Sequence, residues 1–248
     1  RSCDGTIIGE GLGMVVLKRL ADAQRDGDRI YAVVKGLGTS SDGRGNAIYA
    51  PRAEGQKIAL ERAYRASNVT PDTIDLIEAH GTGTRVGDAT ELRALGEVFR
   101  AARPEGAWTA VGSVKSQIGH TKAAAGVAGL IKTALALRHK VLPPTIKVSD
   151  PVEELAPGRS PLYVNTRKRP WLSRPGHPRR AGVSSFGFGG TNFHCVLEEH
   201  PGEQAPVDWD GSVEILALGA KSVEALRQEL ATIPEGISWS DLRQRAAR

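Results

Sequence analysis

Residues 74–84 read Ile-Asp-Leu-Ile-Glu-Ala-His-Gly-Thr-Gly-Thr, an apolar run that passes directly into a loop of glycine and threonine. The short run, entered from the turn signal at 70–72, predicts a buried strand over 74–77. A helix is predicted over 88–101, where apolar residues recur with helical spacing. In α/β sheets, the binding crevice lies where strands end. The stretch therefore indicates a strand–loop–helix unit with His80 at its functional edge.

The same alternation of strand and helix continues on both sides of this unit. A helix is predicted over 53–67 before it, and a strand over 109–114 and a helix over roughly 121–138 follow it. Two late apolar runs, at 181–186 and 193–198, predict strands that flank a glycine-dense turn. Alternating strands and helices, followed by antiparallel strands, describe an α/β layered domain.

Two further strand predictions lie outside this pattern. Near the N-terminus, apolar runs at 14–17 and 30–34 lie on either side of a turn signal at 26–28, which predicts a β-hairpin. Another short strand is predicted at 162–164, after a stretch that consists mainly of loops.

The composition changes after His200. A run rich in Pro and Gly at 201–206 is typical of a linker, and an apolar run at 213–218 predicts a strand beyond it. We therefore expect the layered domain over 1–199, and a linker with the start of a following αβ subdomain over 200–248. Both ends of the chain read as cuts through a longer protein.

The composition is that of a globular protein. Of 248 residues, 40% are hydrophobic and 25% charged, with a net charge of +5. The apolar runs are too short to span a membrane. Two cysteines without paired or metal-like spacing argue against a disulfide framework or a metal site and favour a reducing, cytoplasmic setting. Aromatic residues make up only 5% and no nucleic-acid motif is present, so neither a nucleic acid nor a membrane is expected as a partner.

A second polar segment, Lys-Ser-Gln-Ile-Gly-His-Thr at 115–121, follows the strand predicted over 109–114. His120 is expected at the N-terminus of the helix over 121–138, where the helix dipole would lower the imidazole pKa and keep the ring neutral. A neutral imidazole can donate a hydrogen bond to a developing oxyanion. The alternative is a buried helix that begins with a polar cap.

Two other features have structural alternatives of their own. Asp88 and Glu91 have the spacing of a capping box at the start of the helix over 88–101. The glycines at 187–190 allow positive φ and close backbone approach, but they also fit a plain hairpin turn. Taken alone, His80 fits an ordinary hydrogen-bonded histidine.

Together, the segments closely resemble the β-ketoacyl synthase (ketosynthase) family, specifically the ketosynthase domains of type I polyketide synthases. The resemblance covers about residues 1–199, and Gln117 departs from the Asn of many relatives. Two stretches look like the iterative synthases of the enediyne or polyunsaturated-fatty-acid type. The motifs that carry the family resemblance lie at 9–13, 15–19, 78–84, 115–120 and 187–192, and those that carry the narrower one lie at 119–126 and 139–145.

The resemblance implies a thiolase-like layered αβαβα fold, of which this chain would hold the second half and the last hairpin of the first half. It implies an acyltransferase that catalyses decarboxylative Claisen condensation of a malonyl-type extender with an acyl-Cys intermediate. The alternative is a non-elongating or scaffolding ketosynthase that binds acyl carrier protein without condensing.

The resemblance also implies roles for individual residues. His80 and His120 would hydrogen-bond the malonyl thioester carbonyl and promote decarboxylation. Lys115 would tune the electrostatics of the site through a network with Asp88 and Glu91. Phe188 matches the family's gating phenylalanine, whose backbone N–H helps to form an oxyanion hole. Four further residues match positions that contact the substrate and the phosphopantetheine arm: Thr82, Thr84, Gly189 and Gly190.

Neither cysteine is expected to be the nucleophile. The family's Cys lies at a strand-to-helix turn, where the helix N-terminus lowers the thiol pKa. No helix is predicted directly after Cys3, and Cys195 shares the face of a predicted strand with Phe193 and Leu197 and reads as core. The Cys-bearing half is expected upstream, and this chain by itself is expected to be inactive in condensation.

A basic segment at 167–180 contains no acidic residue. It reads either as a solvated loop or as a docking surface for an acidic carrier protein, through electrostatic steering. The residues in question are Arg167, Lys168, Arg169, Arg174, Arg179 and Arg180. The other expected partners are acyl and malonyl thioesters, adjacent synthase domains and a second copy of the ketosynthase in a homodimer. No cofactor is expected to bind directly, because the carrier protein brings the phosphopantetheine.

Overall fold

The computed structural model describes residues 5–43, 50–156, 158–173, 176–201, 218–238 and 241. The chain divides into two compact units, Arg1–Val207 and Asp208–Arg248. Within the described part of the second unit lies one helix, α6 (Val223–Ala231), whose first turn is capped by the Ser222 hydroxyl. Several sequence predictions fall wholly or largely outside the described residues: Cys3, the linker at 201–206, the strand at 213–218 and Arg174.

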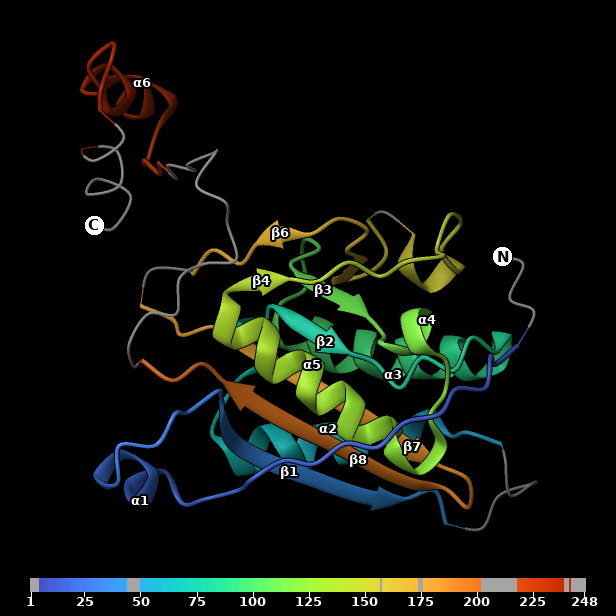
Figure 1. Ribbon diagram of the computed structural model, residues 1–248. Helices are drawn as coiled ribbons and strands as arrows, with labels where there is room; N and C mark the ends of the chain where they lie inside the picture. Colours follow the sequence, from blue (N-terminus) through green and yellow to red (C-terminus); the bar gives the residue numbers. More distant parts are fainter. Residues whose placement is uncertain are drawn as a thin grey trace. The chain divides into compact units, whose positions relative to one another are not determined.

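The first unit is built on a six-stranded sheet in the order β1-β8-β7-β2-β3-β5 (Figure 1). The central strand β2 runs parallel to both neighbours, β7 and β3, and β3 runs parallel to β5. The long pairs β1–β8 and β7–β8 are antiparallel. The strands are β1 (Val33–Ser41), β2 (Leu76–Glu78), β3 (Thr109–Gly112), β5 (Leu162–Val164), β7 (Arg180–Gly187) and β8 (Thr191–Glu198).

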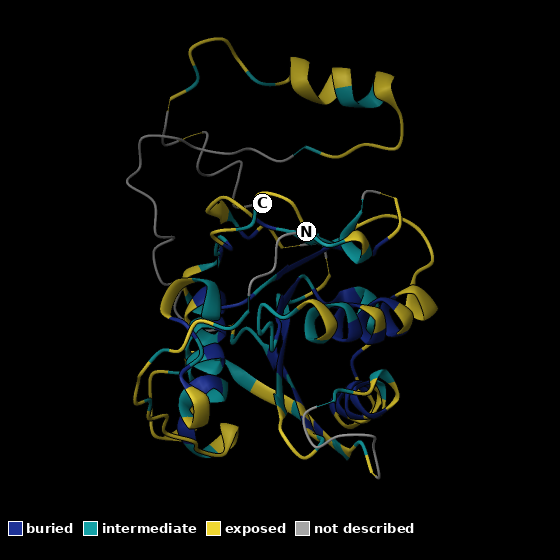
Figure 2. Cartoon of the chain, turned by 90° about the vertical axis from the view of Figure 1, so that its right-hand side faces the viewer, coloured by how far each residue is buried: buried dark blue, intermediate teal, exposed yellow. Residues whose placement is uncertain are grey.

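Helices cover both faces of this sheet (Figure 2). On one face, α2 (Ala53–Ser67) and α3 (Arg85–Ala102) bury an apolar core that includes Leu60, Leu95 and Phe99. On the other face, α5 (Ala125–His139) packs on β7 and β2 with a second core around Leu137. Burying apolar area on both faces explains the layered arrangement.

Short elements complete the first unit: α1 (Leu20–Arg25), α4 (Lys115–Ile118), the paired strands β4 (Val141–Leu142) and β6 (Arg169–Pro170), and 3-10 turns at Pro71–Thr73, Lys122–Ala124 and Glu153–Leu155. In the described part of the chain, no helix is long and apolar enough to cross a bilayer.

Most predicted helices and strands are present. The helix predicted over 53–67 has those bounds, and it ends where Asn68 adopts a left-handed conformation with φ of 52°. The strands predicted at 74–77, 109–114, 162–164, 181–186 and 193–198 correspond to β2, β3, β5, β7 and β8.

Two helix boundaries differ from prediction. Helix α3 begins at Arg85 rather than at residue 88, because the Thr84 hydroxyl caps it by accepting from Gly87 N–H at 3.2 Å. The helix predicted over roughly 121–138 is present as α5 but begins later, at Ala125, because a 3-10 turn over Lys122–Ala124, with positive φ at Lys122, precedes it.

The predicted N-terminal hairpin is wrong. Residues 14–17 form no strand, the helix α1 lies between the two runs, and β1 pairs with β8 from Val33 onward. Met14 and Val16 are 85% and 97% exposed. A two-stranded hairpin is marginal without a face to pack on. Here the second run has a partner in β8, whereas the first has none among the described residues.

Candidate active site

Two histidines from separate segments meet beyond the ends of β2 and β3. His80 follows β2, and His120 follows the short helix α4 after β3. Their ring centroids lie 5.6 Å apart in an edge-to-face arrangement. Phe186, near the end of β7, lies 5.7 Å from His80 and was not singled out from the sequence. Because parallel strands end at the same edge of a sheet, the topology brings these groups together.

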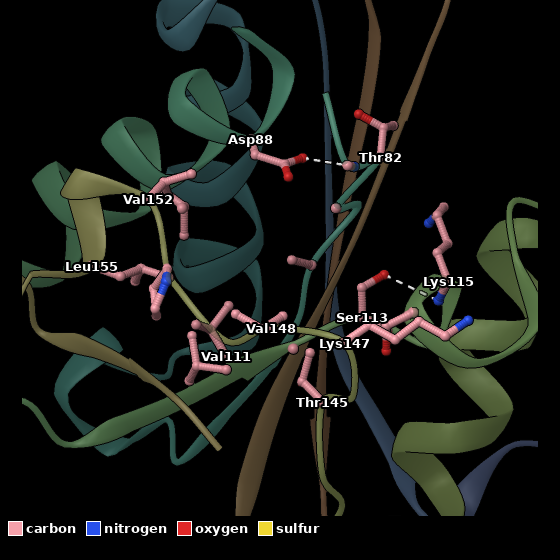
Figure 3. Close-up of a pocket in the computed structure, with 18 of the residues that line it drawn as sticks. Thr82, Asp88, Val111, Ser113, Lys115, Thr145, Lys147, Val148, Val152 and Leu155 are labelled. Atoms are coloured by element: carbon pink, nitrogen blue, oxygen red, sulfur yellow. Dashed lines mark hydrogen bonds between the residues drawn. The ribbon is translucent and has the colours of Figure 1, made fainter. Parts of the chain in front are cut away.

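The His80 loop (residues 79–83) is held by two carboxylates of α3. Glu91 accepts from His80 N–H at 2.8 Å and from Gly81 N–H at 2.9 Å. Asp88 accepts from Gly83 N–H at 3.1 Å and, as Figure 3 shows, faces the backbone of Thr82. Gly81 and Gly83 have φ of 45° and 74°, which glycine adopts without strain.

The interpretation of Asp88 and Glu91 as a capping box is therefore wrong. Thr84 caps the helix, and both carboxylates accept backbone N–H groups of the loop. Burial raises the pKa of Glu91 to about 7, against the opposing effect of its two N–H donors, and burial also raises the pKa of Asp88.

Lys115 begins α4 and lies close to these acids. Burial lowers the pKa of its ammonium, and the negative charges of Glu91, Glu78 and Asp88 oppose that shift. The structure thus brings Lys115 together with Asp88 and Glu91, as expected, and adds Glu78 to the set.

Burial, followed by the charges of Lys115 and His120, lowers the pKa of His80 to about 3. Its ring is therefore neutral near pH 7. His80 Nδ1 is buried and has no hydrogen-bond partner among the described residues. An orphaned N–H is rarer in buried sites than an under-satisfied acceptor, so the geometry favours the tautomer with the proton on Nε2.

His120 has a lowered pKa, as predicted, but the predicted cause is wrong. The 3-10 turn separates it from α5, which begins at Ala125. Partial burial and the charge of Lys115 are the larger causes. His120 Nδ1 accepts from Lys122 N–H at 3.0 Å, so the neutral ring carries its proton on Nε2.

An N-terminal strap (residues 6–9) holds both histidine-bearing loops and was missed in the sequence analysis, which noted Gly9 only as part of a motif. The Thr6 hydroxyl donates to the Thr82 carbonyl at 2.7 Å. His120 N–H donates to the Ile7 carbonyl at 2.7 Å, and Gly9 N–H donates to the His120 carbonyl at 3.1 Å. Contacts across such sequence distances leave no local periodicity to read.

A cavity of about 500 Å³ lies beside the His80 loop (Figure 3). Its walls combine apolar side chains with polar groups, and neither histidine is among its lining residues. Thr82 lines it, whereas the Thr84 hydroxyl is 3.0 Å from that of Thr82 and is used as the cap of α3. The other lining residues labelled in Figure 3 include Asp88, Val111, Ser113, Lys115, Val148 and Leu155.

The glycine loop (residues 187–190) joins β7 to β8. Phe188 lies at the tip of this loop and is 87% exposed. The aromatic ring that packs against His80 belongs to Phe186 instead. Gly189 and Gly190 have φ of 87° and 77°. The loop is tied to the end of β1, because the Gly190 carbonyl accepts from Asp42 N–H at 2.7 Å.

The basic segment is neither a solvated loop nor a free docking surface at its C-terminal end. Arg179 pairs with Glu199 at 2.8 Å and Arg180 with Glu198 at 2.7 Å, and all four side chains are largely buried. Both acids lie on or next to β8, so the segment's lack of acidic residues was misleading. Arg169 donates to Asn165 and Tyr163, while Arg167 and Lys168 are exposed.

Cys195 lies within β8, between β1 and β7, and packs against the core beneath α5. Burial raises the pKa of its thiol to about 11. It is therefore protonated near pH 7 and is a poor nucleophile. On the same face Leu197 is buried, but Phe193 is 43% exposed, so only part of this face is core. Within the described ranges, no group of His, Cys, Asp or Glu could hold a metal ion.

Comparison with known families gives two adjacent matches. Residues 31–149 match the family described as "Beta-ketoacyl synthase, C-terminal domain", and residues 153–239 match "Ketoacyl-synthetase C-terminal extension". The chain belongs to the β-ketoacyl synthase family and carries the C-terminal domain of a polyketide-synthase ketosynthase.

Individual relatives agree with this assignment. The chain is 55% identical to a polyunsaturated fatty acid synthase protein of Thraustochytrium sp. over 81% of its length, and 48% identical to polyketide synthase PksL of Bacillus subtilis over 81%. It spans only 7% and 4% of those proteins.

A solved structure shows the same fold. The ketosynthase from module 6 of the bacillaene synthase of Bacillus subtilis 168 aligns with a TM-score of 0.71 at 42% identity, over 91% of this chain and 40% of that one. The predicted α/β thiolase-like fold is confirmed.

Proposed function

We propose that this chain supplies the two-histidine part of a condensing site that elongates polyketide or fatty-acid-like chains. The observation that carries the proposal is the pair His80 and His120, whose rings lie 5.6 Å apart and whose pKa values are both lowered. Two neutral imidazoles with Nε2–H groups suit a carbonyl oxygen that gains negative charge.

The reaction follows from these donors. A malonyl thioester loses CO₂ when the bond between its carboxylate carbon and Cα breaks, and the electron pair becomes an enolate. His80 and His120 stabilise the enolate oxygen through their N–H groups. The enolate carbon then attacks the carbonyl carbon of an acyl-Cys thioester, and the Cys thiolate leaves. Lys115, held among three acids, adds positive charge beside the site.

Cys195 does not suit the role of acyl carrier, because it lies half-buried within a strand as a neutral thiol. We propose that the nucleophilic Cys comes from another segment of the synthase. An acyl carrier protein would bring the malonyl group on phosphopantetheine past Thr82, Thr84, Gly189 and Gly190. The enzyme would act in the cytoplasm as a homodimer beside other synthase domains. It would belong to an iterative synthase of the enediyne or polyunsaturated-fatty-acid type.

The test is to change each histidine to Asn in the intact synthase and to measure CO₂ release from a malonyl thioester, together with formation of the condensed product. His80→Asn and His120→Asn should each lower decarboxylation by about 100-fold or more, because each removes a donor to the enolate oxygen. His139→Asn, an exposed histidine at the end of α5, is the matched control. Normal rates in both site variants would reject the proposal.

The alternative, a ketosynthase that binds carrier protein without condensing, is not favoured by the relatives, which are named as synthases. The same assay separates the two functions, because a non-elongating protein would bind the carrier but release no CO₂ above background.

A further inference from the structure

Glu78 is almost fully buried and joins the strand before His80 to the turn before Lys115. Its Oε1 accepts from Val114 N–H at 2.6 Å, and its Oε2 accepts from Lys132 Nζ at 2.7 Å. The side chains of Glu78 and Lys132 are 3% and 13% exposed. A buried ion pair is weak support for stability by itself, so its place in the fold calls for another explanation.

The Glu78–Lys132 pair lies next to the segments that carry three groups of the site, namely His80, Lys115 and His120. Glu78 lies two residues before His80, at the end of β2. Val114 directly precedes α4, which begins with Lys115 and leads through Gly119 to His120. One carboxylate therefore fixes the start of α4 relative to the strand that ends in His80.

Helix α5 is shaped to admit this carboxylate. Gly129 and Lys132 lie one turn apart on α5, on the same face. A Cβ at Gly129 would approach Glu78 Cγ to 3.0 Å, so glycine leaves the room that the Glu78 side chain occupies. Lys132 then supplies the positive charge that a buried carboxylate requires.

We propose that Glu78 and Lys132 are a positioning pair for the condensing site, which set the placement and the electrostatic environment of Lys115. This inference rests on the proposed function. Neither residue needs to touch substrate. Their charges act on Lys115 in opposite directions, because Glu78 favours its ammonium form and Lys132 disfavours it.

The opposite signs give a test that a purely structural role would fail. In the intact synthase, malonyl decarboxylation is measured against pH for Glu78→Gln and Lys132→Met. In the profile of rate against pH, the basic limb is where Lys115 loses its proton. Loss of the Glu78 carboxylate should move this limb to lower pH by about one unit. Loss of the Lys132 ammonium should move it to higher pH by a similar amount. Glu78→Gln should lower kcat by about 100-fold, because displacement of α4 misplaces the reacting groups, and leave KM nearly unchanged.

Three further variants keep the result interpretable if a single variant fails to fold. Lys132→Arg retains the charge and should keep the wild-type profile. Glu78→Gln combined with Lys132→Met removes both charges and should return the basic limb close to its wild-type position. Glu97→Gln combined with Lys57→Met makes the same chemical change in an exposed ion pair between α2 and α3 and is the matched control.

Each outcome has a separate meaning. Absence of decarboxylation by the wild-type synthase rejects the proposed function. A wild-type enzyme that decarboxylates, with a basic limb that stays in place or moves in the same direction in both single variants, rejects the positioning pair alone.

Discussion

The His80 loop and the glycine loop are both short and rich in glycine, yet they are held in different ways. The His80 loop donates its N–H groups to two carboxylates of α3, the buried Glu91 and the half-buried Asp88, and accepts from the Thr6 hydroxyl of the strap. The glycine loop has an exposed tip at Phe188 and is tied to Asp42 at one end. The comparison teaches that positive φ alone does not define a site: the site loop is the one whose N–H groups have dedicated acceptors.

The largest effect is expected from removing the acceptor of the His80 loop. Glu91→Ala leaves the N–H groups of His80 and Gly81 without their carboxylate. Each buried N–H without a partner costs about 1–3 kcal/mol, so losing the acceptor of two such groups should lower the free energy of unfolding by roughly 2–6 kcal/mol. Denaturant unfolding measures this change. A loss below about 1 kcal/mol would show that water or a rearranged loop replaces the carboxylate.

The second effect concerns acid. His80 at the site and His194 beneath the glycine-loop hairpin have pKa values lowered to about 3, largely by burial. Their unfolded pKa is near 6.5, so the unfolded state binds more protons between about pH 3 and 6.5. Their contribution to stability is therefore full above pH 6.5 and declines as the pH falls through that window.

Glu91 titrates in the opposite sense, because its folded pKa of about 7 lies above its unfolded value of 4.5. Its contribution is largest below pH 4.5 and is lost as the pH rises through 7. Between pH 4 and 8 the free energy of unfolding should therefore vary less with pH in the wild-type protein than in Glu91→Gln. The variant lacks the carboxyl group whose titration opposes that of the histidines. A second variant, His194→Gln, should make the free energy of unfolding depend less on pH on the acid side. If its pH profile matched that of the wild-type protein, the lowered pKa assigned to His194 would be contradicted.

A smaller effect separates two neighbouring glycines of the glycine loop. A Cβ at Gly190 would lie 2.6 Å from Asp42 Cβ, whereas a Cβ at Gly189 meets nothing within 4 Å. Both have positive φ, which costs an L residue about 1–2 kcal/mol. Gly189→Ala should therefore cost about that amount, and Gly190→Ala clearly more. Thermal unfolding of the two variants side by side would show equal losses if the contact with Asp42 were unimportant.

The smallest effect is expected at the exposed tip. Phe188→Ala should change the free energy of unfolding by less than about 0.5 kcal/mol, because its side chain is 87% exposed. Phe186→Ala removes the ring beside His80 and is the informative comparison. If the two substitutions destabilise the protein equally, the distinction drawn between the two phenylalanines fails.

Local sequence signals predicted much of the framework for physical reasons that the structure makes plain. Helix α2 follows from its buried alanines and from Asn68, which ends it in a left-handed conformation. The two histidines became candidates because glycine and polar residues follow predicted buried strands, but their roles came from the resemblance of several motifs to a known family. The helix predicted from residue 121 begins instead at Ala125, because a 3-10 turn over Lys122–Ala124, with positive φ at Lys122, precedes it.

What the sequence did not reveal depends on contacts between distant residues. Arg180 is 18 residues from its partner Glu198, and Glu78 is 54 residues from Lys132. Neither pair leaves a periodic pattern, and Arg180 was misread as free charge for that reason. The apolar run at 14–17 was misread for a related reason, since a strand needs a partner strand that its own sequence does not specify.

The strap has a consequence for how the site responds to disturbance. The same few residues bind the carbonyl of Thr82 in one loop and both backbone groups of His120 in the other. A displacement of the strap would therefore act on both loops. Its effect would differ between them, because the strap holds the backbone of His120 itself, whereas the His80 backbone keeps its own acceptor, Glu91. The strap is thus a link through which a change on one side of the site can reach the other.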